Sequence, residues 1–163
     1  MHPKNGLTRG GTKVEVVGMD FRYMPQYGVV PHCRFGDKIV RATFESTVRL
    51  VCPSPPSEAK MGISFEVSLN GVDWTDSKLT YSYYEEPVIN SVFPDAGPAS
   101  GGTEVFFTGT NFPNLENQDD FNCRFTPINV QMPPKYSSGK WINSTSIYCA
   151  TPGGWSKGDK MRL

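Results

Sequence analysis

The sequence has no net charge, no long apolar run and almost no histidine, and each absence removes a class of function. Its 163 residues carry 16 basic and 16 acidic side chains, whereas proteins that bind nucleic acid usually carry a clustered basic excess. No apolar stretch approaches the roughly 20 residues that a membrane-spanning helix needs. We therefore expect no nucleic-acid partner, and membrane attachment only through a segment outside this sequence.

Groups suited to catalysis or metal binding are also scarce. Neither His2 nor His32 has a second ligand at metal-binding spacing, and no nucleophile motif of the Gly-x-Ser-x-Gly kind is present. Acidic residues occur in pairs at Glu85-Glu86 and Asp119-Asp120, without the spacing of a calcium loop. The sequence therefore predicts a protein that is not an enzyme and that uses no metal or cofactor.

What the sequence does contain is an internal repeat. Residues 10–21, GGTKVEVVGMDF, return as residues 101–112, GGTEVFFTGTNF, and Cys-Arg-Phe at 33–35 returns at 123–125. The repeat is a whole small domain, longer than the roughly 20–50 residue unit of a solenoid. We expect two domains, residues 1–85 and 86–163, the first without part of its first strand and the second without its C-terminal strands.

Strand patterns dominate both copies, and no helical periodicity is present. Residues 63–69 alternate apolar with polar side chains and end at Asn70-Gly71, a strong hairpin signal. Residues 79–83 alternate in the same way and are expected to pair with 63–69. In the second copy, residues 113–120 and 127–140 have the composition of longer loops. Many short strands separated by turns predict an all-β fold.

Each copy has two cysteines at matching positions, Cys33 and Cys52 in the first, Cys123 and Cys149 in the second. One even pair per copy predicts one disulfide per domain and an oxidising compartment. The alternative is a pair of buried free thiols in each domain of an intracellular protein. The sequon Asn143-Ser144-Thr145 predicts N-glycosylation of Asn143 in a secreted context.

Glycine and aromatic residues recur around the repeated strand. Glycines are expected to provide the turns at both ends of this strand, at Gly10, Gly11, Gly18, Gly101, Gly102 and Gly109. Four phenylalanines are expected in the cores, namely Phe21, Phe35, Phe112 and Phe125. We expect Trp74 and Trp141 to pack in a core or at a strand edge, whereas Trp155, in the segment Pro-Gly-Gly-Trp-Ser, is the tryptophan expected to be exposed.

The ordered set of Gly-Gly-Thr, Gly-x-Asn-Phe and Cys-x-Phe, followed by a strand that ends in cysteine, resembles the IPT/TIG domain. The second copy carries the set as Gly101-Gly102-Thr103, Gly109-Thr110-Asn111-Phe112, Cys123-Arg124-Phe125 and Cys149. The first copy departs from it at Asp20, where the family pattern has Asn. The resemblance implies two tandem immunoglobulin-like β-sandwiches of the E-set type, as in the ectodomains of plexins, Met-type receptors and fibrocystin-like proteins.

The resemblance and the cysteines together predict a non-catalytic segment of a larger extracellular or cell-surface protein. The junction at Glu85-Glu86-Pro87 is too short to be a flexible coil, so the segment is expected to act as a semi-rigid spacer and as a protein-interaction or adhesion module. The expected partners are neighbouring repeats of the same chain and a surface or matrix protein. Two alternatives stay open: an intracellular structural-assembly or DNA-associated IPT/TIG protein, and an accessory module of a secreted carbohydrate-active enzyme.

Overall fold

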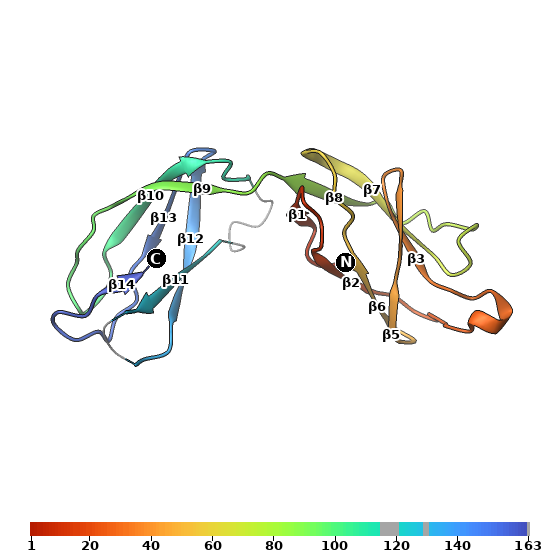
Figure 1. Ribbon diagram of the computed structural model, residues 1–163, viewed down its shortest axis with the longest axis horizontal. Helices are drawn as coiled ribbons and strands as arrows, with labels where there is room; N and C mark the ends of the chain where they lie inside the picture. The colour runs from red at the N-terminus through yellow and green to blue at the C-terminus, as the bar shows by residue number, and fades with distance from the viewer. Residues whose placement is uncertain (115–120, 129–130, 163) are drawn as a thin grey trace. The chain divides into compact units, whose positions relative to one another are not determined.

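The computed structural model describes residues 1–114, 121–128 and 131–162, and it is built almost entirely of β-strands (Figure 1). Within these ranges the only helix is a single 3-10 turn, η1 Pro25–Tyr27, and no helix is long and apolar enough to cross a membrane. The chain divides into two compact units, Met1–Glu86 and Pro87–Leu163, which we call domain 1 and domain 2. The acidic pair Asp119-Asp120 lies outside the described residues.

Domain 1 is a sandwich of a three-stranded and a five-stranded sheet (Figure 1). The smaller sheet has the order β2 (Lys13–Val17), β6 (Arg49–Pro53), β5 (Thr43–Ser46). The larger sheet has the order β1 (Asn5–Leu7), β8 (Leu79–Tyr84), β7 (Lys60–Ser68), β3 (His32–Phe35), β4 (Lys38–Arg41). Strands β7 and β8 pair antiparallel, as the alternating pattern predicted, whereas β1 runs parallel to β8.

The strands of domain 2 are connected in one six-stranded sheet, with the order β14 (Met161–Arg162), β11 (Asn122–Pro127), β12 (Lys135–Asn143), β13 (Ser146–Ala150), β10 (Glu104–Thr110), β9 (Val88–Phe93). Strand β12 pairs with β11 through its first half and with β13 through its second half. The change occurs at Gly139, whose N–H donates to the carbonyl of Phe121 at 2.6 Å. In domain 1 the same place is held by Ala42, which donates to Pro31 at 2.9 Å and separates β4 from β5.

The expectation of a loop over residues 127–140 is wrong for residues 135–140, because β12 begins at Lys135, whereas residues 128 and 131–134 are in no strand. Ser137, Ser138 and Gly139 interrupt the apolar alternation that marks a strand, so the sequence pattern favours a loop there. The backbone pairing with β11 and β13 makes this segment a strand all the same.

Each sandwich buries its own aromatic core. The four phenylalanines Phe21, Phe35, Phe112 and Phe125 are all buried, and Phe35 packs edge-on against Phe65 with ring centroids 4.9 Å apart. Trp155 is a correction: we expected it to be exposed, but it is only 8% exposed. Its ring packs in the core of domain 2, and the Lys135 ammonium lies 4.2 Å from the ring centroid.

The repeated glycines serve two different geometric needs. Gly10 and Gly101 adopt left-handed φ values of 77° and 80°, which glycine reaches without steric cost. A Cβ on Gly10 would also lie 2.6 Å from the backbone nitrogen of Pro56. Gly18 has no such φ requirement; a Cβ there would lie 2.5 Å from the ring of Phe21, so this glycine makes room for a core side chain. Gly11 and Gly102 donate to the carbonyls of Ser54 and Thr151 at 2.8 Å.

Candidate protein-interaction surface

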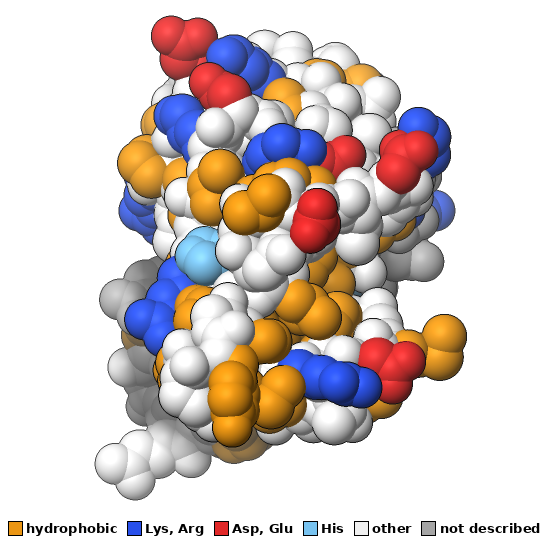
Figure 2. Space-filling model, turned by 90° about the vertical axis from the view of Figure 1, so that its right-hand side faces the viewer, with side chains coloured by type: hydrophobic (Ala, Val, Ile, Leu, Met, Phe, Trp, Pro, Cys, Tyr) orange, Lys and Arg blue, Asp and Glu red, His pale blue; other side chains and the backbone are white. Residues whose placement is uncertain are grey.

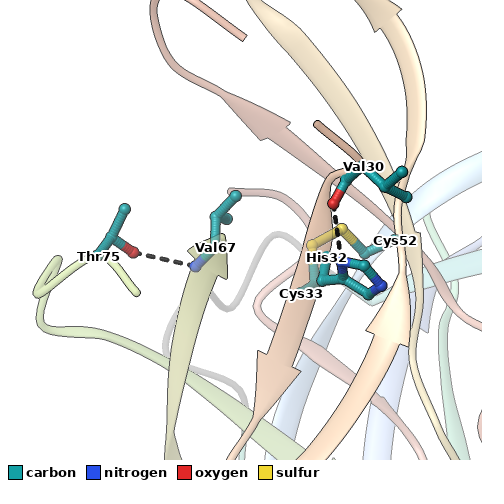
Figure 3. The surroundings of a disulfide bond; sticks show 6 residues. All are labelled: Val30, His32, Cys33, Cys52, Val67 and Thr75. Carbon is teal, nitrogen blue, oxygen red and sulfur yellow. Dashed lines mark hydrogen bonds between the residues drawn. A yellow bond between two sulfur atoms is a disulfide. The ribbon is translucent and has the colours of Figure 1, made fainter. Parts of the chain in front are cut away.

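A disulfide ties the two sheets of domain 1 together. Cys33 on β3 is bonded to Cys52 on β6, with Cα atoms 6.3 Å apart (Figure 3). The Nδ1 of the neighbouring His32 donates a hydrogen bond to the Val30 carbonyl at 2.7 Å. The hydroxyl of Thr75 accepts the N–H of Val67 at 3.0 Å and anchors the loop after β7. The side chains of His32 and Thr75 near this disulfide therefore form hydrogen bonds to the backbone of the same domain.

The second disulfide occupies the equivalent position in domain 2. Cys123 on β11 is bonded to Cys149 on β13, again with Cα atoms 6.3 Å apart. A Cβ on Gly139 would lie 2.8 Å from the sulfur of Cys149, so glycine at the crossing point of β12 makes room for the bridge. Structural disulfides form and persist in oxidising environments. The chain is therefore extracellular or at the cell surface.

The described residues contain no group of three or more histidine, cysteine or acidic side chains placed to hold a metal ion. All four cysteines are taken up in disulfides. We therefore looked for exposed side chains on the two domains that could contact another protein.

The outer face of domain 2 carries an aromatic ladder, which we define as Phe93, Phe106, Tyr148 and Lys140. These residues stand opposite one another across four adjacent strands: Phe93 pairs with Phe106, Phe106 with Tyr148, and Tyr148 with Lys140. The rings of Phe106 and Tyr148 lie 5.6 Å apart, and the Lys140 ammonium lies 5.8 Å from the Tyr148 ring centroid. Phe93 is 74% exposed and Phe106 is 37% exposed, so the ladder presents its aromatic surface to solvent.

The matching positions of domain 1 hold no aromatic ring of the Phe or Tyr kind; they are His2, Glu15, Val51 and Thr43. In domain 1, His2 pairs with Glu15, Glu15 with Val51, and Val51 with Thr43. These pairs have the same strand register as the pairs of the aromatic ladder in domain 2. Glu15 is occupied by an ion pair with Arg49, whose guanidinium also lies 3.1 Å from Glu45. The hydrogen bond with Glu15, and then the charges of Glu15 and Glu45, raise the pKa of Arg49. The aromatic ladder is therefore a property of domain 2 and not of the repeated fold.

Domain 1 exposes apolar side chains elsewhere, mixed with charges of both signs (Figure 2). Tyr23, in the loop before η1, stacks on Phe44 at 6.4 Å. Its hydroxyl accepts a hydrogen bond from Arg41 at 2.9 Å. On β3, Arg34 lies 4.6 Å from the ring centroid of Trp74 and forms an ion pair with Glu66. Trp74 is thus half-buried in the loop between β7 and β8, beside Arg34, and not in the core or at a strand edge as expected.

Asn143 is the exposed last residue of β12, directly before the turn that leads to β13. Its side-chain Oδ1 accepts the N–H and the hydroxyl of Thr145, both at 2.9 Å. We expect a glycan here when the protein is secreted from eukaryotic cells, because the sequon is surface-accessible. Intact-mass measurement before and after enzymatic deglycosylation checks this, with Asn143→Gln as the variant that removes the shift. A secreted protein of unmodified mass would contradict the prediction.

Comparison with known proteins identifies the family. The IPT/TIG domain family matches residues 1–83 and again residues 87–162. The chain belongs to the IPT/TIG family. The expected resemblance and the two immunoglobulin-like sandwiches are thereby confirmed.

Two relatives illustrate where IPT/TIG tandems of this kind occur. The chain is 27% identical to human plexin-A2 over 155 residues, which is 93% of this chain and 8% of plexin-A2. It is 28% identical to mouse fibrocystin-L over 166 residues, covering 95% of this chain and 4% of that protein. The fold is also similar to part of the plexin A4 extracellular region, with a TM-score of 0.52, 21% identity, and coverage of 96% of this chain and 12% of that one. The chain thus spans less than a tenth of the length of these two relatives.

The aromatic ladder was not predicted from the sequence, although a signal for it existed. In the strand Glu104–Thr110, Val105 and Phe107 face the core, so an adjacent Phe106 must face outward. What the sequence could not show is that Phe93 and Tyr148 stand beside it, because that depends on the register of three strands.

Proposed function

We propose that this chain is a non-catalytic spacer and protein-interaction segment of a larger extracellular or cell-surface protein, and that domain 2 makes the contact through the aromatic ladder. The observation that carries the proposal is the contrast between two copies of one fold. Domain 2 has the exposed aromatic residues Phe93 and Phe106 at positions where domain 1 has His2 and Glu15, and Glu15 is held in an ion pair with Arg49.

The chemistry of the ladder suits a protein partner. Exposed aromatic side chains supply large rigid contact areas, and Tyr and Phe are enriched in the cores of protein interfaces. Lys140 adds a cation at one end of the ladder. A contiguous apolar stripe exposed on a sheet face is the kind of patch that marks an interaction site on a soluble domain.

Cross-linking with an amine-reactive reagent, on cells that display the native protein, tests this surface. We expect Lys140 to give cross-links to a second polypeptide. In the Phe93→His/Phe106→Glu variant, which installs the residues that domain 1 has at these positions, we expect these cross-links to fall at least about tenfold, as loss of roughly 1.4 kcal/mol of contact energy requires.

Lys13, on the exposed edge of β2 in domain 1, is the internal control, since its cross-links should not change in that variant. The proposal fails if Lys140 links only to residues of its own domain, or if the variant leaves its intermolecular links intact.

The spacer part of the proposal depends on the junction. Only three residues separate Tyr84 at the end of β8 from Val88 at the start of β9. Pro87 restricts the backbone of the residue before it, and the Glu86 carboxylate lies 3.4 Å from the Arg9 guanidinium within domain 1. These features limit the freedom of the connecting chain.

We therefore expect both domains to tumble together in solution. Amide ¹⁵N relaxation should give one correlation time for residues of both domains, and two distinct, shorter times after insertion of a ten-residue Gly/Ser linker between Glu86 and Pro87. Two independent correlation times in the unmodified protein would refute the spacer role while leaving the aromatic ladder untouched.

A further inference from the structure

The expected glycan site at Asn143 lies on the same face of domain 2 as the aromatic ladder. Asn143 on β12 stands opposite Ser146 on β13, and Ser146 comes two residues before Tyr148 of the ladder. The residue between them, Ile147, is buried, so Ser146 and Tyr148 point outward, because alternate residues of a strand share a face. Asn143 and Tyr148 are diagonal neighbours across this strand pair, and such neighbours lie about 7–8 Å apart, within reach of long side chains.

A polar row runs beside the ladder on this outer face. Asn143 pairs with Ser146, Ser146 with Thr108, and Thr108 with Ser91, whose hydroxyl is hydrogen-bonded to that of Thr108. The face therefore presents amide and hydroxyl groups next to aromatic rings. A sugar can use both, because its C–H bonds pack against the electron-rich face of an aromatic ring and its hydroxyl groups bond to serine and threonine.

In domain 1 the matching face is covered by a side chain of the domain itself. The counterparts of Ser146 and Phe106 are Arg49 and Glu15. The Arg49 guanidinium forms ion pairs with Glu15 and with Glu45, so this long side chain extends to the position that Phe106 holds in domain 2. The serine at position 146 is too short to do the same. The space beside the ladder is thereby left to a substituent on Asn143.

The amide of Asn143 is oriented by its own turn. Its Oδ1 accepts the backbone N–H and the hydroxyl of Thr145, both at 2.9 Å. The turn is fixed to the chain around the end of β10, because Gly109 donates to the Thr145 carbonyl at 2.9 Å and Phe112 donates to the Ser144 carbonyl at 3.0 Å. An N-linked glycan is attached at Nδ2, the other polar atom of this amide. Its first sugar therefore starts from a held point on the outer face.

We propose that the N-linked glycan of Asn143 folds over the aromatic ladder, with its first sugar ring packed against Tyr148 beside the polar row, and that it thereby limits the access of a protein partner to the ladder. The contact between sugar and ladder is independent of the proposed function, whereas the control of access rests on it. A glycan that covers the ladder lowers the apparent affinity for a partner in proportion to the fraction of molecules whose ladder is open.

NMR of the glycoprotein tests the sugar contact. The protein is secreted from eukaryotic cells with ¹³C-labelled glycans, and an endoglycosidase trims the glycan to its first N-acetylglucosamine. We expect nuclear Overhauser effects between this sugar and the Tyr148 ring, and upfield shifts of the sugar protons that face the ring. In the Tyr148→Ser variant, both signals should disappear while the mass of the attached sugar stays the same.

A sequon at the matching position of domain 1 is the control. Ser46 and Val48 occupy the positions of Asn143 and Thr145. Ser46→Asn/Val48→Thr, in the Asn143→Gln background, therefore moves the glycan to a face without an aromatic ladder, where its first sugar should have unshifted resonances. Equal shifts at the two positions, or no contact with the Tyr148 ring in the parent protein, would overturn the glycan cover. A secreted parent protein of unmodified mass would overturn it as well.

Cross-linking at Lys140, on cells that display the protein, tests the control of access. In Asn143→Gln, the intermolecular cross-links of Lys140 should rise at least about threefold above the native level, because the ladder is then always open. Thr145→Ala, which removes the sequon at another residue, should give the same rise, and the links of Lys13 should not change. Lys140 links that are present but unaffected by loss of the glycan would overturn the control of access alone. Absence of such links in the native protein and in both variants would overturn the proposed function and the control of access together, whereas the sugar contact is decided by the NMR result.

Discussion

We expect the Cys33→Ala/Cys52→Ala variant to lose about 3 kcal/mol of the free energy of unfolding of domain 1, because the bridge closes a loop across a sequence separation of 19 residues. A domain of this size holds only about 5–10 kcal/mol in total. At about 4–8 °C per kcal/mol, the melting temperature of domain 1 should fall by about 12–24 °C. Urea unfolding followed by amide NMR signals of each domain measures the loss.

The matching Cys123→Ala/Cys149→Ala variant is the control, since the second bridge has a sequence separation of 26 and should give a similar loss in domain 2 alone. If either double variant unfolds at the same urea concentration as the parent protein, the bridges do not stabilise the folded domains. If both domains weaken together in either variant, the two units do not unfold independently.

The second large effect should come from the aromatic core of domain 1. Phe35 is 1% exposed and packs against Phe65 and Tyr81 with ring centroids 4.9 and 5.0 Å away. Phe35→Ala would remove both contacts and leave a cavity, which typically costs about 3–5 kcal/mol. Denaturant unfolding monitored at domain 1 amides checks the value.

Phe93→Ala removes the same side chain from the exposed ladder of domain 2 and is the matched comparison. It should change the free energy of unfolding by no more than about 0.5 kcal/mol, because the ring is mostly in solvent. If Phe35→Ala and Phe93→Ala lowered the free energy of unfolding by similar amounts, the difference in burial between the two side chains would be contradicted.

The fold could be predicted because the turn motifs that define it lie in short sequence segments and occur in both domains. The Gly-Gly-Thr segments and the residues at Asp20 and Asn111 recur at matched turns, and the latter two adopt left-handed φ values of 57° and 61°. Asp and Asn tolerate this conformation better than other side chains, so the change from Asn to Asp in the first copy leaves the turn intact. The antiparallel pairing of the segments 63–69 and 79–83 followed from their alternation and from the turn signal Asn70-Gly71.

The errors arose where tertiary contacts override local composition. Trp155 follows two glycines and looks like part of an exposed turn, yet its backbone N–H donates to the Ala99 carbonyl at 3.1 Å and its ring enters the core. The candidate interaction surface needed information that no single segment contains, namely the register that brings Phe93, Phe106 and Tyr148 side by side. The cysteine pairs Cys33–Cys52 and Cys123–Cys149 and the sequon at Asn143 could be placed from sequence, because each depends on residues of a recognisable local motif.

The chain is a pair of disulfide-braced extracellular modules, and disulfide mapping of the native protein is the direct test of this description. Under non-reducing conditions, proteolytic fragments should show Cys33 linked to Cys52 and Cys123 linked to Cys149, with no free thiol before reduction. Four free thiols in the native protein would contradict the account and would support an intracellular IPT/TIG protein instead.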